Sequence, residues 1–169
     1  MAPAGAAVFP IYLITYRIFS GPPERESRNL VTISRHELQF IINHAEKAYP
    51  EECCGFLLGV NTDERQILRA LSVPNANKID RGKRYNIDPL DIIRADEIAQ
   101  KSNLEVIGVY HSHPGAPPRP SQVDLENAWP WYTYLVVAVE NGHENGVGAW
   151  KLSEDRSTFH PVKLVVEDE

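Results

Sequence analysis

The stretch VIGVYHSHPGAPPRPSQVD, residues 106–124, decides how this chain is organised. Its apolar first half ends at a proline and is followed by a proline-rich segment, which predicts a buried strand that leads into a surface loop. Because successive side chains of a strand point to opposite faces, His111 and His113 should share one face, and Tyr110 and Ser112 the other. The sequence therefore predicts two imidazoles side by side at the end of a strand.

Two imidazoles in this arrangement are suitable ligands for one zinc ion. A catalytic zinc typically keeps three protein ligands and leaves a fourth position to water, so a third ligand is needed. Asp124 is the best candidate, because the prolines end the strand and Ser121 can cap a new helix that brings Asp124 back towards the histidines. The alternative without metal is a strand-end histidine pair beside an ordinary capping box, in which Ser121 bonds to the backbone near Asp124. The joint spacing favours zinc.

Length and composition indicate one soluble globular domain. The chain has 169 residues, of which 43% are hydrophobic and 24% charged. A net charge of −6 argues against broad electrostatic attraction to nucleic acid or to an anionic membrane. The one dense basic cluster contains Arg81, Lys83 and Arg84, and a solvated loop is a commoner use of such a cluster than a phosphate site.

Neither a membrane segment nor a disulfide is expected. The apolar run 8–19 is shorter than the roughly 20 residues that span a bilayer, and the N-terminus lacks the pattern of a secretory signal, so a cytoplasmic location is the default. The only two cysteines, Cys53 and Cys54, are adjacent and fit a reducing compartment. Buried small hydrophobic residues are their favoured interpretation.

Hydrophobic periodicity and turn residues predict an α+β chain after an N-terminal arm, residues 1–29, that is loosely attached or irregular. The predicted strands are 30–33, 55–60, 66–73, 106–113, 133–140, 146–153 and 159–166, with turns at Asn141 and Asn145. A first helix runs from a capping box at Ser34 to Pro50, a second starts at Asp88, and a short third runs from Ser121 to about Ala128. The second helix should bury a stripe of Leu90, Ile92, Ile93, Ala95, Ile98 and Ala99.

Peptide hydrolysis at a zinc site also needs a group that accepts the proton of the attacking water. A carboxylate upstream of the histidines would serve, and Glu51 and Glu52 stand at the break between the first helix and the next strand. Two glutamates after a proline are more often a solvated loop. Three aromatic residues just beyond the site, Trp129, Trp131 and Tyr132, could line a substrate groove, although core packing is the commoner use.

These residues resemble the JAMM (MPN+) metallopeptidases, whose motif is an upstream Glu, then HS or HT, H, seven residues and SxxD. Here His111, Ser112 and His113 are followed by seven residues and by Ser121 and Asp124. The segment YPEECCGFLLG is similar to the family's PxExCG segment, and this alignment selects Glu52 rather than Glu51. The resemblance covers residues 30–166, which we expect to form the JAMM/MPN+ domain.

The resemblance implies a fold, a cofactor and a substrate. The fold would be a mixed β-sheet flanked by helices, three-layer α/β/α-like and similar to cytidine deaminase. Zn²⁺ would be held by His111, His113 and Asp124, Glu52 would be the general base, and Ser121 would stabilise the oxyanion. Compact prokaryotic members resemble proteases that cut after the C-terminal Gly-Gly of ubiquitin-like or sulfur-carrier proteins.

Two other functions stay open at this point. One is a non-catalytic MPN scaffold that binds partner proteins, and the other is a zinc hydrolase of small amides or thio-metabolites. The deaminase reaction itself is disfavoured, because HSH replaces the HxE of that family and no PCxxC segment is present. The sequence leaves the oligomeric state open, homo-oligomers included.

Overall fold

The computed structural model describes residues 29–62 and 64–168, so the expectations for residues 1–28 lie outside the described part of the chain. The elements follow in the order β1 (Leu30–Ser34), α1 (Arg35–Ala48), β2 (Cys54–Asn61), β3 (Arg65–Val73), α2 (Pro89–Lys101), β4 (Glu105–Pro114), α3 (Gln122–Asn127), β5 (Thr133–Glu140), β6 (His143–Leu152) and β7 (Phe159–Glu167).

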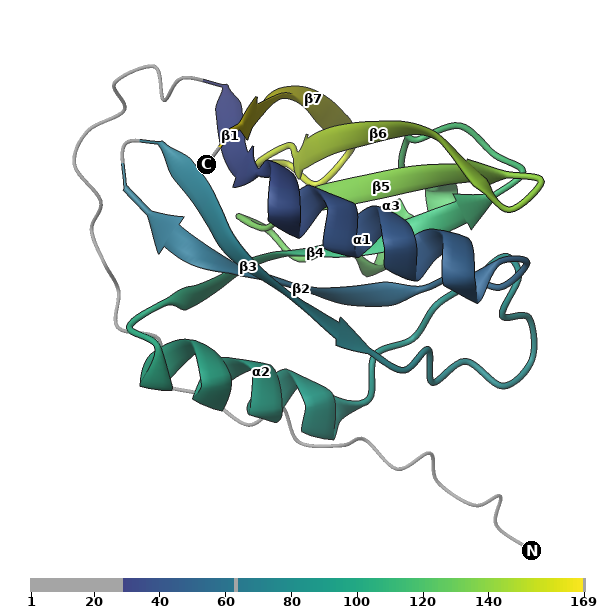
Figure 1. Ribbon diagram of the computed structural model, residues 1–169, viewed down its shortest axis with the longest axis horizontal. Helices are drawn as coiled ribbons and strands as arrows, with labels where there is room; N and C mark the ends of the chain where they lie inside the picture. The colour runs from purple at the N-terminus through teal and green to yellow at the C-terminus, as the bar shows by residue number, and fades with distance from the viewer. Residues whose placement is uncertain (1–28, 63, 169) are drawn as a thin grey trace, which may run out of the picture.

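The strands of the described residues form one mixed sheet that closes on itself in the order β1-β3-β2-β4-β5-β6-β7. The pairs β1–β3, β1–β7 and β4–β5 are parallel, and the others are antiparallel. In Figure 1, α1 lies in front of the strands and α2 lies below β2 and β3. The expected α+β fold, a mixed sheet with flanking helices, is confirmed, while the closure through β1 and β7 was not predicted.

Two hydrophobic cores use the two faces of the sheet, and strand alternation divides the side chains between them. On β2, Leu57 belongs to the core that contains α1, whereas Phe56 and Leu58 belong to the core that contains α2. On β4, Tyr110 points to the first core and Val109 to the second. His111 and His113 therefore emerge on the face that α2 covers, beyond the end of its core.

Both long helices begin where the sequence predicts. The Ser34 side chain accepts a hydrogen bond from the Glu37 backbone at 3.2 Å, and Asp88 caps α2 ahead of Pro89. The second bond of this capping box, from the Ser34 backbone N–H to the Glu37 carboxylate, is not found among the described residues. The Glu37 carboxylate instead accepts from the backbone N–H of Ala70 at 2.7 Å. That bond ties the start of α1 to β3.

The burial of α2 differs from the prediction. Ala95 and Ala99 are fully buried, but Leu90, Ile92 and Ile93 are 60%, 41% and 56% exposed. At about 100° per residue, Ile93 lies on the far side of the helix from Ala95, and no single face can bury both. Within the described residues, no helix has the length and apolar character that a membrane crossing requires.

In the C-terminal half one further expectation is wrong, and another is met by one residue of three. The turn at Asn141 is present, but Asn145 lies inside β6, where Gly146 has a φ of 118° and the pairing with β5 shifts. An Asn-Gly pair also suits a β-bulge, because both need backbone that glycine adopts readily. Trp129 and Trp131 are 56% and 59% exposed and do not pack in the core, whereas Tyr132 packs against the second core.

Candidate metal and catalytic site

The register of two antiparallel strands brings the upstream glutamate to the histidines. Cys54, the first residue of β2, pairs with His111, and the Ser112 backbone donates to the Cys53 carbonyl at 3.1 Å. One further residue along this register places Glu52 opposite His113. The Cys53 backbone also donates to the Ser112 hydroxyl at 2.9 Å, so the serine predicted on the face opposite the histidines links the two strands.

The structure brings His111, His113 and Asp124 together as a buried group. Their ligand atoms all lie within 4.8 Å of one another. The two Nε2 atoms are 3.0 Å apart, His111 Nε2 is 3.2 Å from one Asp124 carboxylate oxygen, and His113 Nε2 is 3.4 Å from the other. The three side chains are 0–8% exposed. The proline-rich loop thus returns α3 to the end of β4.

These separations suit a tetrahedral metal. Ligand bonds of about 2.0–2.1 Å at tetrahedral angles place neighbouring donor atoms roughly 3.3 Å apart, close to the three distances observed. Nδ1 of His113 lies 3.1 Å from the Pro117 carbonyl, to which it can donate only as N–H. Once the Nε2 proton that faces Asp124 in the metal-free site is lost, this ring offers the Nε2 lone pair that a metal needs. The donor set and its geometry therefore fit Zn²⁺.

The groups around these ligands hold them in place. The backbone N–H and the hydroxyl of Ser121 both donate to one Asp124 oxygen at 2.6 Å, and the Asp124 backbone donates back to the Ser121 hydroxyl at 3.2 Å. The predicted capping box at α3 is thus present and includes the carboxylate itself. Tyr85 stacks on His111, with ring centroids 4.6 Å apart.

The pKa values of the two carboxylates move in opposite directions. Burial raises the pKa of Glu52 to about 7, in spite of the opposing attraction of His113. Burial also opposes ionisation of Asp124, yet hydrogen bonds to His111 and His113 hold its pKa well below the usual range. Burial lowers the pKa of His111, whereas the pKa of His113 is raised, because contact with Asp124 outweighs burial there. Asp124 is thus an anion at neutral pH, and Glu52 can gain or lose a proton.

Glu52 and Glu51 occupy different environments. Glu52 is 6% exposed, and its backbone N–H donates to the Arg81 carbonyl at 2.7 Å. Glu51 is half-exposed and pairs with the Arg81 guanidinium at 3.2 Å. Of the two glutamates, only Glu52 lines the cleft that contains His113.

Sequence reasoning missed Asn75, which organises the connection between β3 and α2. Its amide N–H₂ donates to the carbonyls of Glu52 and Arg84, both at 3.0 Å, and its carbonyl oxygen accepts from the backbones of Asn77 and Asn86. This buried amide fixes the backbone on which Glu52 stands. The one available signal was an asparagine shortly after a strand, which is typical of many loops.

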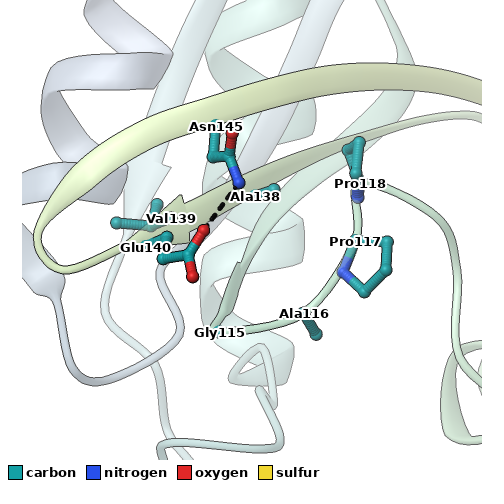
Figure 2. A pocket seen from close by; sticks show the side chains of 8 residues that line it. All are labelled: Gly115, Ala116, Pro117, Pro118, Ala138, Val139, Glu140 and Asn145. Atoms are coloured by element: carbon teal, nitrogen blue, oxygen red, sulfur yellow. Dashed lines mark hydrogen bonds between the residues drawn. The ribbon is translucent and has the colours of Figure 1, made fainter.

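A cleft of about 340 Å³ opens beside the ligands. Its lining consists of Glu52, Gly82, Lys83, His113, Pro114, Ala116, Pro117, Arg119, Pro120 and Ser121. A second pocket, drawn in Figure 2, lies between residues 115–118 and strands β5 and β6. In that pocket the Glu140 carboxylate accepts a hydrogen bond from Asn145, and none of the three ligands lines it. Of these two spaces, only the cleft joins Glu52 to the ligand group.

The two cysteines lie under the site without taking part in the ligand group. Both are buried free thiols, as expected for small hydrophobic residues. Burial raises the pKa of Cys53 to about 11 and that of Cys54 to about 12. Both thiols are therefore protonated at neutral pH, which suits packing rather than ligation or nucleophilic attack.

Comparisons with known proteins agree with this geometry. The family described as prokaryotic homologs of the JAB domain matches residues 34–153. A protein of Pyrococcus furiosus named desampylase is 33% identical over 83% of this chain and 94% of its own. A protein of Mycobacterium tuberculosis named CysO-cysteine peptidase is 23% identical over 74% of this chain and 84% of its own.

A solved structure shares the fold. The solution structure of protein DSY2949 from Desulfitobacterium hafniense is 25% identical to this chain. The two superimpose with a TM-score of 0.73 over 82% of this chain and 94% of that one.

Proposed function

This chain belongs to the family of prokaryotic JAB-domain homologues, and from that premise we propose that it is a zinc-dependent peptidase or isopeptidase. Its proposed substrate is a ubiquitin-like or sulfur-carrier protein, cut after a C-terminal Gly-Gly. The observation that carries this proposal is the buried group of His111, His113 and Asp124 beside a cleft that also contains Glu52. The relatives named desampylase and CysO-cysteine peptidase support hydrolysis of a bond to a small carrier protein.

The proposed metal ligands are His111, His113 and Asp124, which supply two neutral nitrogens and one negative charge. A Zn²⁺ ion held there would supply Lewis acidity, which lowers the pKa of a coordinated water and polarises a carbonyl group. The protein fixes the ligands before any metal arrives, because Ser121 orients the Asp124 carboxylate and Pro117 orients the His113 ring. Because these ligand side chains need not move far when the metal binds, the site suits tight binding of the ion.

Glu52 is the proposed general base. It takes a proton from the attacking water and passes that proton to the nitrogen of the leaving amine, so that no covalent acyl intermediate is needed. A pKa of about 7 in the metal-free site suits a group that must both accept and release a proton near neutral pH. Asn75 and the Arg81 carbonyl hold the backbone of Glu52 and limit its movement.

Ser121 is the proposed donor to the oxyanion, and the structure adds a condition to that role. Its single hydroxyl proton now points to Asp124 at 2.6 Å, so it must turn away to reach a substrate oxygen. The Ser121 backbone N–H keeps its own bond to the same carboxylate when the hydroxyl turns. One residue can therefore orient a ligand and stabilise the tetrahedral intermediate, a duty typically worth about 10²–10³ in kcat.

The test uses a ubiquitin-fold carrier that bears a short extension after its C-terminal Gly-Gly. The zinc-loaded chain is incubated with this carrier, and mass spectrometry detects release after the second glycine. Glu52→Gln should keep its zinc and lose hydrolysis by several orders of magnitude, whereas Glu51→Gln, the adjacent control, should retain both. Unchanged turnover in Glu52→Gln at normal zinc content would remove Glu52 from the mechanism.

The non-catalytic scaffold is tested by the same experiment. A wild-type chain that carries zinc and binds the carrier without cutting it would favour the scaffold. Cleavage of small amides with the carrier left intact would favour a metabolite hydrolase.

A further inference from the structure

The cleft beside the proposed ligands contains two basic side chains that have no anionic partner within residues 29–62 and 64–168. Lys83 enters it from the connection before α2, and Arg119 enters it from the proline-rich loop. Among the described residues, no ion pair and no side-chain hydrogen bond involves Lys83 or Arg119. Arg81, two residues before Lys83, is by contrast paired with Glu51 at 3.2 Å.

The charge of this cleft is opposite to that of the whole chain. The net charge is −6, yet Glu52 is the only carboxylate among the lining residues, against two cations. Asp124 lies beside the cleft, but its charge is engaged by His111, His113 and Ser121. The two unpaired cations therefore make this cleft attractive to an anionic group of the substrate.

The position of Glu52 indicates which part of the substrate that anion belongs to. Under the proposed function, Glu52 hands its proton to the leaving amine, so this amine must lie in the cleft that Glu52 lines. In a released α-amino acid, the carboxylate is attached to the same carbon as the amine. The amine and a nearby carboxylate would thus meet Glu52 on one side and the two cations on the other.

We propose that Lys83 and Arg119 bind the free carboxylate of the leaving group, an inference that rests on the proposed function. The preferred substrate is then a carrier whose Gly-Gly is followed by one α-amino acid or a short peptide. A lysine side chain within a folded protein lacks such a carboxylate. Arg119 suits this task because a guanidinium can bond both oxygens of a carboxylate, and Lys83 adds a second positive charge.

The cleft volume agrees with a small leaving group. A space of about 340 Å³ lies near the lower end of the range for pockets that enclose small molecules. A different use of the two cations would be contact with acidic residues on the carrier protein itself. In that case the cleavage rate would not depend on whether the terminal carboxyl group is free or amidated. The two uses of the cations can therefore be distinguished by experiment.

The experiment compares two carriers that end in Gly-Gly-Ala, one with a free carboxylate and one with a terminal carboxamide. The zinc-loaded wild type should cleave the carboxylate substrate with a kcat/KM about tenfold higher, mainly through KM, which is typical for loss of a charge-assisted hydrogen bond. In Lys83→Met and in Arg119→Gln this ratio should fall towards one. Lys78→Met, on the same connection but outside the cleft lining, should keep the wild-type ratio.

Each outcome decides something. Equal rates for the carboxylate and the carboxamide in the wild type would overturn the carboxylate site while leaving peptidase activity intact. A retained preference in the Lys83→Met, Arg119→Gln double variant would likewise overturn it. Cleavage of neither substrate by a zinc-loaded chain would contradict the proposed function, and this inference with it.

Discussion

At the scale of the residue, two carboxylates of one site are prepared for opposite tasks by their surroundings. Asp124 receives hydrogen bonds from two histidines and a serine and stays ionised. Glu52 is buried, its carboxylate accepts none of the hydrogen bonds found among the described residues, and its pKa rises to about 7. A permanent anion suits a metal ligand, and a group that titrates near neutral pH suits a base.

The raised pKa of Glu52 predicts a pH-dependent cost to stability in the metal-free protein. Below the unfolded pKa of about 4.5 the Glu52 carboxyl is neutral in both the folded and the unfolded chain and does not change the free energy of unfolding. Above about 7 it is charged while buried, which lowers that free energy. Glu52→Gln should therefore stabilise the metal-free chain at pH 8, by on the order of 2 kcal/mol, and change it little at pH 4. Urea denaturation at both values measures this.

The half-exposed neighbour supplies the control for that measurement. Glu51→Gln loses its ion pair with Arg81 and should shift the free energy of unfolding by less than about 1 kcal/mol. A Glu52→Gln chain that is no more stable than wild type at pH 8 would show that the Glu52 carboxylate is not penalised by burial.

At the scale of the element, strand β4 connects the core to the site. Its apolar residues divide between the two cores as far as Tyr110, and the next residues of the strand include both histidines. Tyr110 is fully buried, and its hydroxyl oxygen lies 2.8 Å from Nδ1 of His44 on α1. The packing that holds Tyr110 therefore also sets the position of His111.

Gly55 is the point at which this packing has least room. A Cβ atom placed there would lie 2.4 Å from the Tyr110 ring and 2.4 Å from the Leu71 carbonyl oxygen. We expect Gly55→Ala to cost about 1–3 kcal/mol of stability, because a buried ring or the neighbouring strand must move. Ser72→Ala, on the exposed partner position of β3, should cost less than about 0.5 kcal/mol. Chemical denaturation of both variants checks this, and equal costs would contradict it.

The elements were predictable where the signal is local, and the errors arise where it is not. The strand that ends in HSH, the hairpin of β2 and β3, and the caps Ser34 and Asp88 each depend on a few adjacent residues. The pairing of β1 with β7 joins segments more than a hundred residues apart, and no local pattern encodes it. Too many apolar residues of α2 were predicted to be buried, because the surface against which a helix packs, rather than its composition, decides which side is buried.

The candidate site follows the same distinction. The spacing within residues 111–124 was sufficient to predict that the two histidines share a face and that Asp124 returns towards them, and the structure places the three side chains together. Asn75 and Tyr85 contact the site from a connection whose path depends on tertiary structure. Periodicity carries no information about such contacts.

At the scale of the whole molecule, we propose that residues 30–166 are the folding and catalytic unit. β1 is paired on both sides, with β3 and with β7, so the sheet closes within the described residues. A chain that begins at residue 29 should melt within about 3 °C of the full chain and hydrolyse the carrier at a similar rate. Circular dichroism and the mass-spectrometric assay measure both. A large loss of either would show that residues 1–28 belong to the unit.

The central claim is that two imidazoles and one carboxylate of this chain bind a divalent metal, and a zinc titration of the chelator-treated protein tests it most directly. The account predicts one zinc per chain in the wild type and in His143→Ala, an exposed control, and loss of that zinc in His113→Ala and Asp124→Ala. A wild-type chain that takes up no stoichiometric zinc, or an Asp124→Ala chain that binds it as tightly as wild type, would contradict the account.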